Sequence, residues 1–366
     1  MRNPNAPIAP GSTIGIVGGG QLGRMTAVAA AELGYKVHIF TPEPNAPAVQ
    51  VAKHATVAPY DNQDAIEAFG RMVDVITFEF ENVPAETVRH LTELAPVRPS
   101  WECLAVCQDR VAEKSFCAEL GIETAPWKAV GSIEELRAAI AEVGAPAVLK
   151  TARLGYDGKG QVRIHTETDP ARAWDEIGGG PAVLEGFVEF ELEISVITAR
   201  RPGGEMASFD VVENRHKGGI LDVTIAPADI SSEVAQAARD IGQKLTQAMD
   251  LVGLLAVEMF VTEKGRLLVN EMAPRPHNSG HWTQDGCATS QFEQFVRAVC
   301  GLPLGATVRH SDTVMKNLLG EDANLWEQHL SDPDNKLHLY GKDDAKPGRK
   351  MGHINRIYPK GSQPKG

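Results

Sequence analysis

The chemistry suggested by this sequence centres on two glutamates in neighbouring apolar runs. Glu258 and Glu271 belong to two such runs, and the polar stretch 262–265 separates them. Apolar runs on either side of a short turn that contains glycine predict a β-hairpin. With Lys264 and Gly265 as a two-residue turn, the register places Glu258 directly opposite Glu271.

Two carboxylates that face each other across a ladder repel, and a bare charge among apolar neighbours is costly. A hard divalent cation such as Mg²⁺, itself holding phosphates, would neutralise them because it prefers oxygen ligands. The alternative is an exposed hairpin edge with two solvated glutamates. A loop that only connects two elements needs few hydrogen-bonding side chains, yet the turn after the hairpin contains Arg275, His277, Asn278, Ser279 and His281. We therefore predict half of an active site here.

A second group of residues is suited to anions. Lys150 ends a predicted strand, and the following loop, 151–161, contains three glycines and two cationic residues. Such a loop is typical of phosphate binding, although its spacing is not that of a Walker A loop and a plain hairpin loop is the alternative. The acidic strand end at Glu185 and the apolar residues after it suit a nucleoside.

The densest cationic patch lies near the end of the chain, in the segment 342–350. It is either a solvated loop or a clamp on a substrate phosphate. Its cationic residues are Lys342, Lys346, Arg349 and Lys350.

Composition limits the class of protein. The 366 residues predict two or three domains, and 43% hydrophobic with 23% charged residues is ordinary for a globular enzyme. A net charge of −12 argues against a nucleic-acid-binding surface. Five cysteines without a CxxC pair predict free thiols in a reducing cytosol. Neither a signal peptide nor a membrane span is evident, so we expect a cytoplasmic protein without membrane or nucleic-acid partners.

The predicted elements alternate and indicate an α/β fold. Glu79 and Glu81 lie at the carboxyl end of the predicted strand 73–80, where open α/β sheets bind ligands, and a solvated strand end is the alternative for either residue. Further helices are predicted over residues 64–72, 84–94, 109–120, 133–143, 232–249 and 290–299. Further strands are predicted over residues 147–150, 182–185, 191–198, 209–213, 313–318, 336–340 and 351–357.

The chain opens with a strand, a glycine turn, a helix and a second strand, with the pattern Gly18-x-Gly20-x-x-Gly23 at the turn. This pattern is also found in NAD-binding domains. An NAD site expects an acidic residue at the end of the second strand, whereas here Glu43 lies beyond Pro42. A structural or phosphate-holding turn is therefore favoured over an NAD site.

Taken together, the motifs resemble those of the ATP-grasp superfamily and, within it, the N5-carboxyaminoimidazole ribonucleotide synthases of purine biosynthesis. The match runs nearly end to end. Its segments are GIVGGGQLGRM (15–25), FEFENV (78–83), QDRVAEK (108–114), LKTARLGYDGKGQ (149–161), NEMAPRPHNSGHWT (270–283) and KPGRKMGHIN (346–355).

The resemblance implies an ATP-grasp fold with an N-terminal Rossmann-like preATP-grasp domain, a small lid and a C-terminal β-rich cap. We expect these units at residues 1–109, 110–188 and 189–366, with an ATP-grasp region of about 114–303. It also implies a homodimer. ATP would convert bicarbonate to carboxyphosphate, and the amine of 5-aminoimidazole ribonucleotide would then capture the carboxyl group or the CO₂ it releases. NAD and biotin are not implied.

The resemblance also assigns residues. Two Mg²⁺ ions would lie on Glu258 and Glu271. ATP would contact Arg110, Lys150, Gly155, Tyr156, Asp157, Gly158, Lys159, Gly160, Gln161, Glu185, Gly186, Phe187, Val188, Glu193, His216, Asn270 and Glu271. The ribonucleotide and bicarbonate would contact Gln21, Leu22, Glu79, Arg275, His277, Lys342, Arg349 and Lys350. The residues closest to the chemistry would be Tyr156, Asp157, Lys159 and Arg275.

Three rival functions remain. A formate-activating ATP-grasp ligase acting on glycinamide ribonucleotide would share the fold and metal site. An NAD-dependent oxidoreductase would use the glycine turn but leave the paired glutamates unexplained. A non-enzymatic nucleotide-binding module would not need a second anion site.

Overall fold

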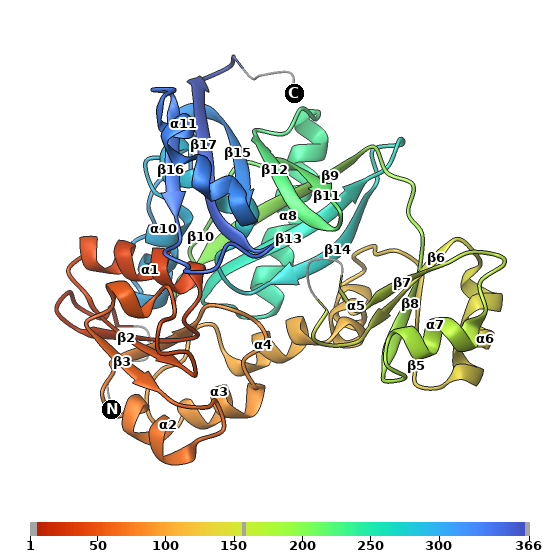
Figure 1. The fold of residues 1–366 in the computed structure, drawn as a ribbon, viewed down its shortest axis with the longest axis horizontal. Helices are drawn as coiled ribbons and strands as arrows, with labels where there is room; N and C mark the ends of the chain where they lie inside the picture. The colour runs from red at the N-terminus through yellow and green to blue at the C-terminus, as the bar shows by residue number, and fades with distance from the viewer. Residues whose placement is uncertain (1–5, 156–158, 363–366) are drawn as a thin grey trace.

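The computed structural model describes residues 6–155 and 159–362, and within these the strands form three sheets (Figure 1). The first sheet is parallel, with the order β3-β2-β1-β4. Its strands are β1 (Thr13–Val17), β2 (Lys36–Thr41), β3 (His54–Val57) and β4 (Val75–Phe78). Its helices are α1 (Gln21–Glu32), η1 (Val49–Val51), α2 (Gln63–Gly70), α3 (Ala85–Leu91) and α4 (Trp101–Gln108).

The register of the first sheet positions two predicted site residues. Val17, the last residue of β1, lies beside Phe78, the last residue of β4. Since parallel strands end at the same edge, Glu79 lies next to the glycine turn that follows β1. The prediction that Glu79 and Glu81 lie at the carboxyl end of a strand is confirmed, although β4 already ends at Phe78.

The second sheet is small, with the order β5-β8-β6-β7, and is reached through α5 (Arg110–Glu119). Asp109 caps α5 by accepting hydrogen bonds from the amides of Val111 and Ala112. Leu149 and Leu184 belong to the core that this sheet shares with its helices. The elements are β5 (Trp127–Val130), α6 (Ile133–Val143), β6 (Ala147–Thr151), β7 (Gln161–Ile164), α7 (Pro170–Glu176) and β8 (Ala182–Gly186).

The third sheet has nine strands, in the order β14-β13-β9-β11-β12-β15-β17-β16, with β10 beside β9. The strands are β9 (Leu192–Arg200), β10 (Met206–Ser208), β11 (Val212–Lys217), β12 (Ile220–Ala226), β13 (Gly253–Val261), β14 (Leu267–Ala273), β15 (Ser311–Leu319), β16 (Asn335–Leu339) and β17 (Lys350–Pro359). The C-terminal strands extend this sheet, because β15 pairs with β12.

The helices of the third unit pack against this sheet and the first domain. α8 (Ser232–Ala248) contributes Ala238 and Leu245 to one core, and α10 (Gln291–Cys300) contributes Phe292 and Phe295 to another that includes Met25 of α1. The remaining short helices are η2 (Asn278–Gly280), α9 (Thr283–Gly286), η3 (Gly320–Leu325) and α11 (Trp326–Leu330). None of the helices in the described residues is both long and apolar enough to cross a membrane.

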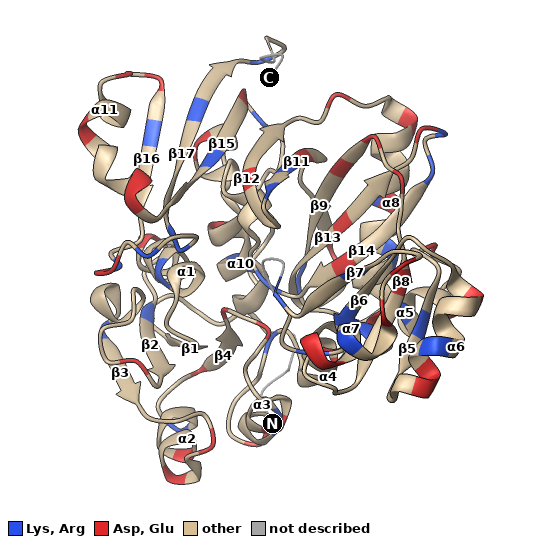
Figure 2. Cartoon of the chain, turned by 45° about the vertical axis from the view of Figure 1, so that its right-hand side comes forward, with Lys and Arg blue, Asp and Glu red and all other residues tan. Residues whose placement is uncertain are grey.

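One predicted strand has the wrong bounds, and one helix near the site was not predicted. The strand predicted over residues 209–213 is β11, which begins at Val212 and runs to Lys217, so His216 lies within a strand and not after one. The helix α4 was not predicted, although it supplies Gln108 at the junction between the first domain and α5. Acidic and basic positions are spread over all three sheets and their helices (Figure 2).

Candidate active site

The predicted facing of the two glutamates is confirmed: Glu258 of β13 pairs with Glu271 of β14. The predicted two-residue turn is wrong. The amide of Thr262 donates to the carbonyl of Arg266 at 3.0 Å, so three residues form the turn, and the last of them, Gly265, has φ +71°. This moves the register near the turn by one residue, and a bulge at Asn270 moves it back. The two deviations cancel at the glutamates.

The carboxylates of Glu258 and Glu271 and the ring of His277 form a compact group of metal-ligand types, with their ligand atoms within 4.8 Å of one another. Burial, and then the charge of Glu271, raise the pKa of Glu258 to about 8. Burial lowers the pKa of His277 well below its usual value, so this ring is neutral at pH 7. The buried Oδ1 of Asn270 has no hydrogen-bond partner. A cation that prefers oxygen ligands would neutralise the two carboxylates.

Cationic side chains lie beside this group. The Arg110 guanidinium is 3.7 Å from Glu271, and its Nη2 approaches the carbonyl of Gly155 at 3.5 Å. Lys150 lies 2.8 Å from Glu185, at the end of β8. Burial raises and Lys150 and Lys114 lower the pKa of Glu185; the lysines prevail, and the pKa falls to about 2.

A carboxylate partner for Lys114 near the start of its helix was plausible from the sequence, and Glu185 is that partner; Glu113 is a functional candidate that the sequence reasoning missed. Lys114 is 1% exposed and lies 3.1 Å from Glu185, while the Glu113 carboxylate accepts a hydrogen bond from the amide of Met272, just after Glu271. Burial raises the pKa of Glu113 to about 8. Hydrophobic periodicity does not predict that either side chain is buried, because both are charged residues in an amphipathic helix.

Glu193 and His216, predicted at the ribose and near the triphosphate, form an ion pair between β9 and β11. Burial lowers and the Glu193 carboxylate raises the pKa of His216, with a net increase. Of the predicted nucleoside contacts, Gly186 and Val188 are half-buried and Phe187 is exposed. Tyr156, Asp157 and Gly158 lie outside the described residues, whereas Gly160 and Gln161 lead into β7.

The glycine turn after β1 holds a carboxylate of the protein itself. Glu79 accepts hydrogen bonds from the amides of Gly20 at 2.6 Å and Gly23 at 3.1 Å. A Cβ on Gly20 would lie 2.6 Å from the Glu79 carboxylate, so the absence of a side chain there is what admits Glu79. The amides that would bind a dinucleotide pyrophosphate are thus engaged, which disfavours the NAD interpretation. Gln21 and the buried Leu22 begin α1 beside this turn.

A second carboxylate from the same loop reaches the other domain. Glu81 forms a salt bridge with Arg275, which follows the β13–β14 hairpin. Burial raises and Arg275 lowers the pKa of Glu81, and the net effect is a decrease. The predicted substrate residues Glu79, Arg275 and His277 are therefore linked to the metal-ligand group through adjacent loops.

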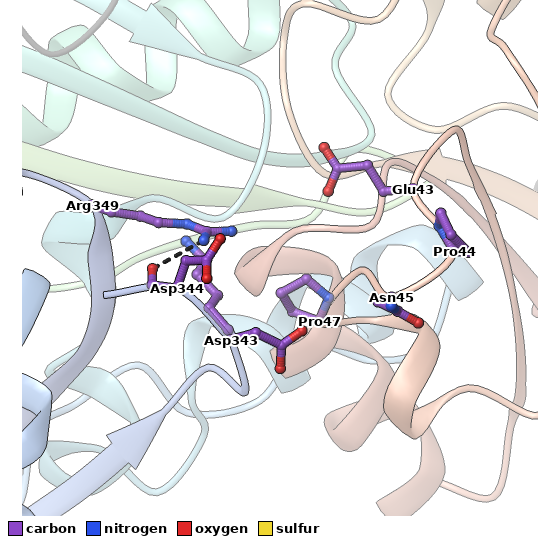
Figure 3. A pocket seen from close by; sticks show the side chains of 8 residues that line it. Glu43, Pro44, Asn45, Pro47, Asp343, Asp344 and Arg349 are labelled. Atoms are coloured by element: carbon purple, nitrogen blue, oxygen red, sulfur yellow. Dashed lines mark hydrogen bonds between the residues drawn. The ribbon is translucent and has the colours of Figure 1, made fainter. Parts of the chain in front are cut away.

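The cationic segment 342–350, the cationic tail, faces the first domain. Lys342 donates to the carbonyl of Lys350 at 2.7 Å, and Arg349 donates to the carbonyl of Asp344 at 3.0 Å. A pocket of about 200 Å³ lies between this tail and residues 43–47 (Figure 3). Burial, followed by the charge of Arg349, lowers the pKa of Lys342 to about 8.

Comparison with known proteins identifies the family. The ribonucleotide synthetase preATP-grasp domain model matches residues 12–108, the ATP-grasp domain model residues 115–292, and the phosphoribosylaminoimidazole carboxylase C-terminal domain model residues 313–363. The chain is 53% identical over 355 residues to the N5-carboxyaminoimidazole ribonucleotide synthase of Brucella melitensis, covering 96% of this chain and 98% of that protein. The chain belongs to the N5-carboxyaminoimidazole ribonucleotide synthase family.

Solved structures of this synthase family agree in fold. One crystallised as an ADP complex has a TM-score of 0.93 at 45% identity, covering 96% of this chain and 93% of that one. The Aspergillus clavatus synthase, crystallised with ADP and 5-aminoimidazole ribonucleotide, has a TM-score of 0.89 at 30% identity, covering 95% and 94%. The predicted α/β ATP-grasp fold with a preATP-grasp domain is confirmed, and the resemblance to this synthase family is confirmed in preference to the formate-activating ligase.

Proposed function

We infer that this protein carboxylates 5-aminoimidazole ribonucleotide with bicarbonate and ATP, forming N5-carboxyaminoimidazole ribonucleotide, ADP and phosphate in purine biosynthesis. Its relatives have the name of this synthase. The observation that carries the inference at the site is the facing pair Glu258 and Glu271, with Arg110 beside it and Arg275 joining it to the loop of Glu79. One metal-ligand group and one substrate loop thus meet at a single place.

The residues present fit Mg²⁺. Glu258 and Glu271 supply carboxylate oxygens, and the unpartnered Oδ1 of Asn270 supplies another acceptor of the kind that Mg²⁺ prefers. When bound, Mg²⁺ neutralises charge on the phosphates of ATP. The two carboxylates are suited to holding two ions, and Arg110 keeps Glu271 oriented from the side of α5.

The nucleotide would lie between the small sheet and the nine-stranded sheet. Lys150 and Arg110 are placed to contact phosphates, together with the loop that contains Gly155, Lys159, Gly160 and Gln161. The predicted phosphate contacts Tyr156, Asp157 and Gly158 belong to the same loop. Glu185 to Val188 would border adenine, and Glu193 with His216 would border the ribose and phosphates.

The second substrate would lie between the glycine turn and the cationic tail. Glu79 is held at the turn, where it can accept a hydrogen bond from the ribonucleotide. Gln21 and Leu22 at the start of α1 would contact the same molecule. Its phosphate would be bound by Lys342 and Arg349, which line the pocket, and by Lys350, whose carbonyl accepts a hydrogen bond from Lys342.

The chemistry needs two bond exchanges. An oxygen of bicarbonate attacks the γ-phosphorus of ATP, the bond to the β-phosphate oxygen breaks, and carboxyphosphate and ADP form. The exocyclic amine of the ribonucleotide then bonds to the carboxyl carbon, phosphate leaves, and the amine proton passes to a base. Arg275 would orient the carboxyl group, with His277 beside it, and Tyr156, Asp157 and Lys159 would orient bicarbonate or take the proton.

The test is ADP release with Mg²⁺ and ATP in degassed buffer. Turnover that requires 5-aminoimidazole ribonucleotide and increases with bicarbonate supports the proposal. Turnover that requires glycinamide ribonucleotide and formate would replace the substrate while keeping the metal site. No turnover of folded protein with any of these substrates would contradict the proposed activity.

We also propose that the synthase is a cytoplasmic homodimer. All five cysteines are free, as predicted, which suits a reducing compartment. Light scattering on the purified protein tests the dimer, since a mass near 39.4 kDa would show a monomer.

A further inference from the structure

Gln108 stands at the junction between the first domain and the ATP-grasp region. It is the last residue of α4, and α5 begins two residues later at Arg110 (Figure 1). The preATP-grasp model ends at residue 108 and the ATP-grasp model begins at residue 115. Although glutamine is usually exposed, this side chain is only 8% exposed.

The amide of Gln108 is fully used, and its two ends contact different parts of the protein. Its Nε2 donates to the carbonyls of Glu81 and Val83, each at 2.5 Å. Its Oε1 accepts a hydrogen bond from Nη2 of Arg153 at 2.7 Å. A glutamine amide offers two donor hydrogens and one acceptor oxygen, so this side chain matches both neighbours at once.

The Arg153 end belongs to the nucleotide side. Arg153 follows β6, which ends in Lys150-Thr151, and is one of the two cationic residues of the predicted phosphate-binding loop 151–161. The carbonyl of the adjacent Ala152 accepts a hydrogen bond from the amide of Arg110 at 2.9 Å. Arg110 in turn lies 3.7 Å from Glu271. Arg153 is therefore next to a backbone contact with Arg110, the residue that lies beside the metal-ligand group.

The other end belongs to the substrate side. The Glu81 carbonyl bonds to Gln108, while the Glu81 carboxylate forms a salt bridge with Arg275. Two residues earlier, the Glu79 carboxylate is held at the glycine turn. Gln108 thus fixes the backbone of the loop that orients both Glu79 and Arg275.

We propose that Gln108 is a positioning residue that couples nucleotide binding to binding of the ribonucleotide, through Arg153 on one side and the loop 79–83 on the other. The proposal rests on the proposed function. When nucleotide binds beside Arg110 and Lys150, Arg153 holds the Gln108 amide in the orientation that fixes Glu81 and Val83. By linkage, the ribonucleotide then tightens nucleotide binding by the same factor.

The experiment measures this coupling directly. The Kd of a non-hydrolysable ATP analogue with Mg²⁺ is determined by calorimetry without and with saturating 5-aminoimidazole ribonucleotide. For the unmodified protein we expect the ribonucleotide to tighten analogue binding at least about fivefold, the lower end of ordinary allosteric couplings. Gln108→Met, which has similar length but no amide, should bring the two Kd values within about twofold of each other.

Two further variants separate the ends of the link. Arg153→Met changes an exposed residue, removes the hydrogen bond that Arg153 donates to Gln108, and should also abolish the coupling. Gln108→Glu keeps an acceptor for Arg153 but has no donor for the two carbonyls, so it should fail as Gln108→Met does. Arg137→Met, an exposed arginine of α6 in the same unit, is the matched control and should keep the coupling.

The outcomes are distinct. A merely structural role would lower the Tm of the Gln108 variants and leave the ratio of Kd values unchanged, which would overturn the proposal. Absence of coupling in the unmodified protein, or its retention in Arg153→Met, would also overturn it. If the unmodified protein neither binds nor turns over 5-aminoimidazole ribonucleotide, the proposed function itself fails, and this is visible before any variant is compared.

Discussion

Replacing Glu258 by glutamine tests the electrostatic account of the carboxylate pair. In the folded protein without metal, burial and Glu271 raise the pKa of Glu258 from 4.5 to about 8. Between these values the folded state binds more protons than the unfolded state, so the free energy of unfolding falls as pH rises through this window. The loss of stability that comes from ionising Glu258 is absent below the pKa of this group in the unfolded state and complete above its pKa in the folded state.

The size of the effect follows from the pKa difference. At about 1.36 kcal/mol for each pKa unit, full ionisation of Glu258 costs at most about 5 kcal/mol. Its side chain is 13% exposed, with His277 3.5 Å away. Partial solvation at such a site leaves a measurable cost of roughly 2–4 kcal/mol. Glu258→Gln removes this cost and keeps the shape of the side chain.

The assay is urea unfolding in EDTA at a series of pH values. We expect nearly equal stability of the two proteins near about pH 4, and a variant that is more stable by roughly 2–4 kcal/mol near about pH 9. Glu113 titrates in the same window, since its pKa is also raised to about 8, but it is present in both proteins and cancels in the difference.

Magnesium provides the second half of the assay. Bound Mg²⁺ should stabilise the unmodified protein above pH 8 by mass action, and the variant much less, because one ligand has lost its charge. A difference between the proteins that stays constant with pH would refute the reasoning. So would a variant that is the less stable protein at high pH, because ionising Glu258 would then not be the dominant cost at this site.

Three further predictions concern activity. Glu271→Ala should reduce ATP turnover to background while the Tm stays near that of the exposed turn control Glu263→Ala; near-normal turnover would remove the metal assignment. Arg349→Ala should raise the KM for 5-aminoimidazole ribonucleotide about tenfold, the equivalent of about 1.4 kcal/mol, because one charge-assisted phosphate contact is lost; a change confined to the KM for ATP would rule out the clamp. Gly20→Ala should also raise the ribonucleotide KM and leave the KM for ATP unchanged, because the new Cβ would lie 2.6 Å from the Glu79 carboxylate, while φ −76° suits alanine without strain; an unchanged ribonucleotide KM would show that the position of Glu79 at the turn is unimportant.

Much of the architecture can be read from local patterns. The helix α6 has the bounds predicted for it, and Ser132 caps it by accepting a hydrogen bond from the amide of Glu135. Hydrophobic periodicity and capping residues act within a few positions along the chain, so the sequence alone is sufficient to predict such elements. The order of motifs likewise identified the family before any contact was known.

The hairpin shows how a correct contact can follow from incorrect details. The sequence predicted Glu258 opposite Glu271, but not the three-residue turn or the bulge at Asn270 that together produce this pairing. A bulge depends on how both strands pack on their neighbours. Here β14 is the edge strand, and the Glu113 carboxylate bonds to the amide of Met272 one residue beyond Glu271.

The sequence by itself determined the α/β elements, the family and the types of residue available for metal, phosphate and carboxyl chemistry. Only the tertiary structure decided which of them meet: Glu79 with the amides of the glycine turn, Glu185 with Lys114, and Gln108 with both domains. The physical reason is that a buried charge or amide is stable only beside a matching partner. That partner comes from a segment distant in the sequence, and local sequence patterns do not predict which residue it is.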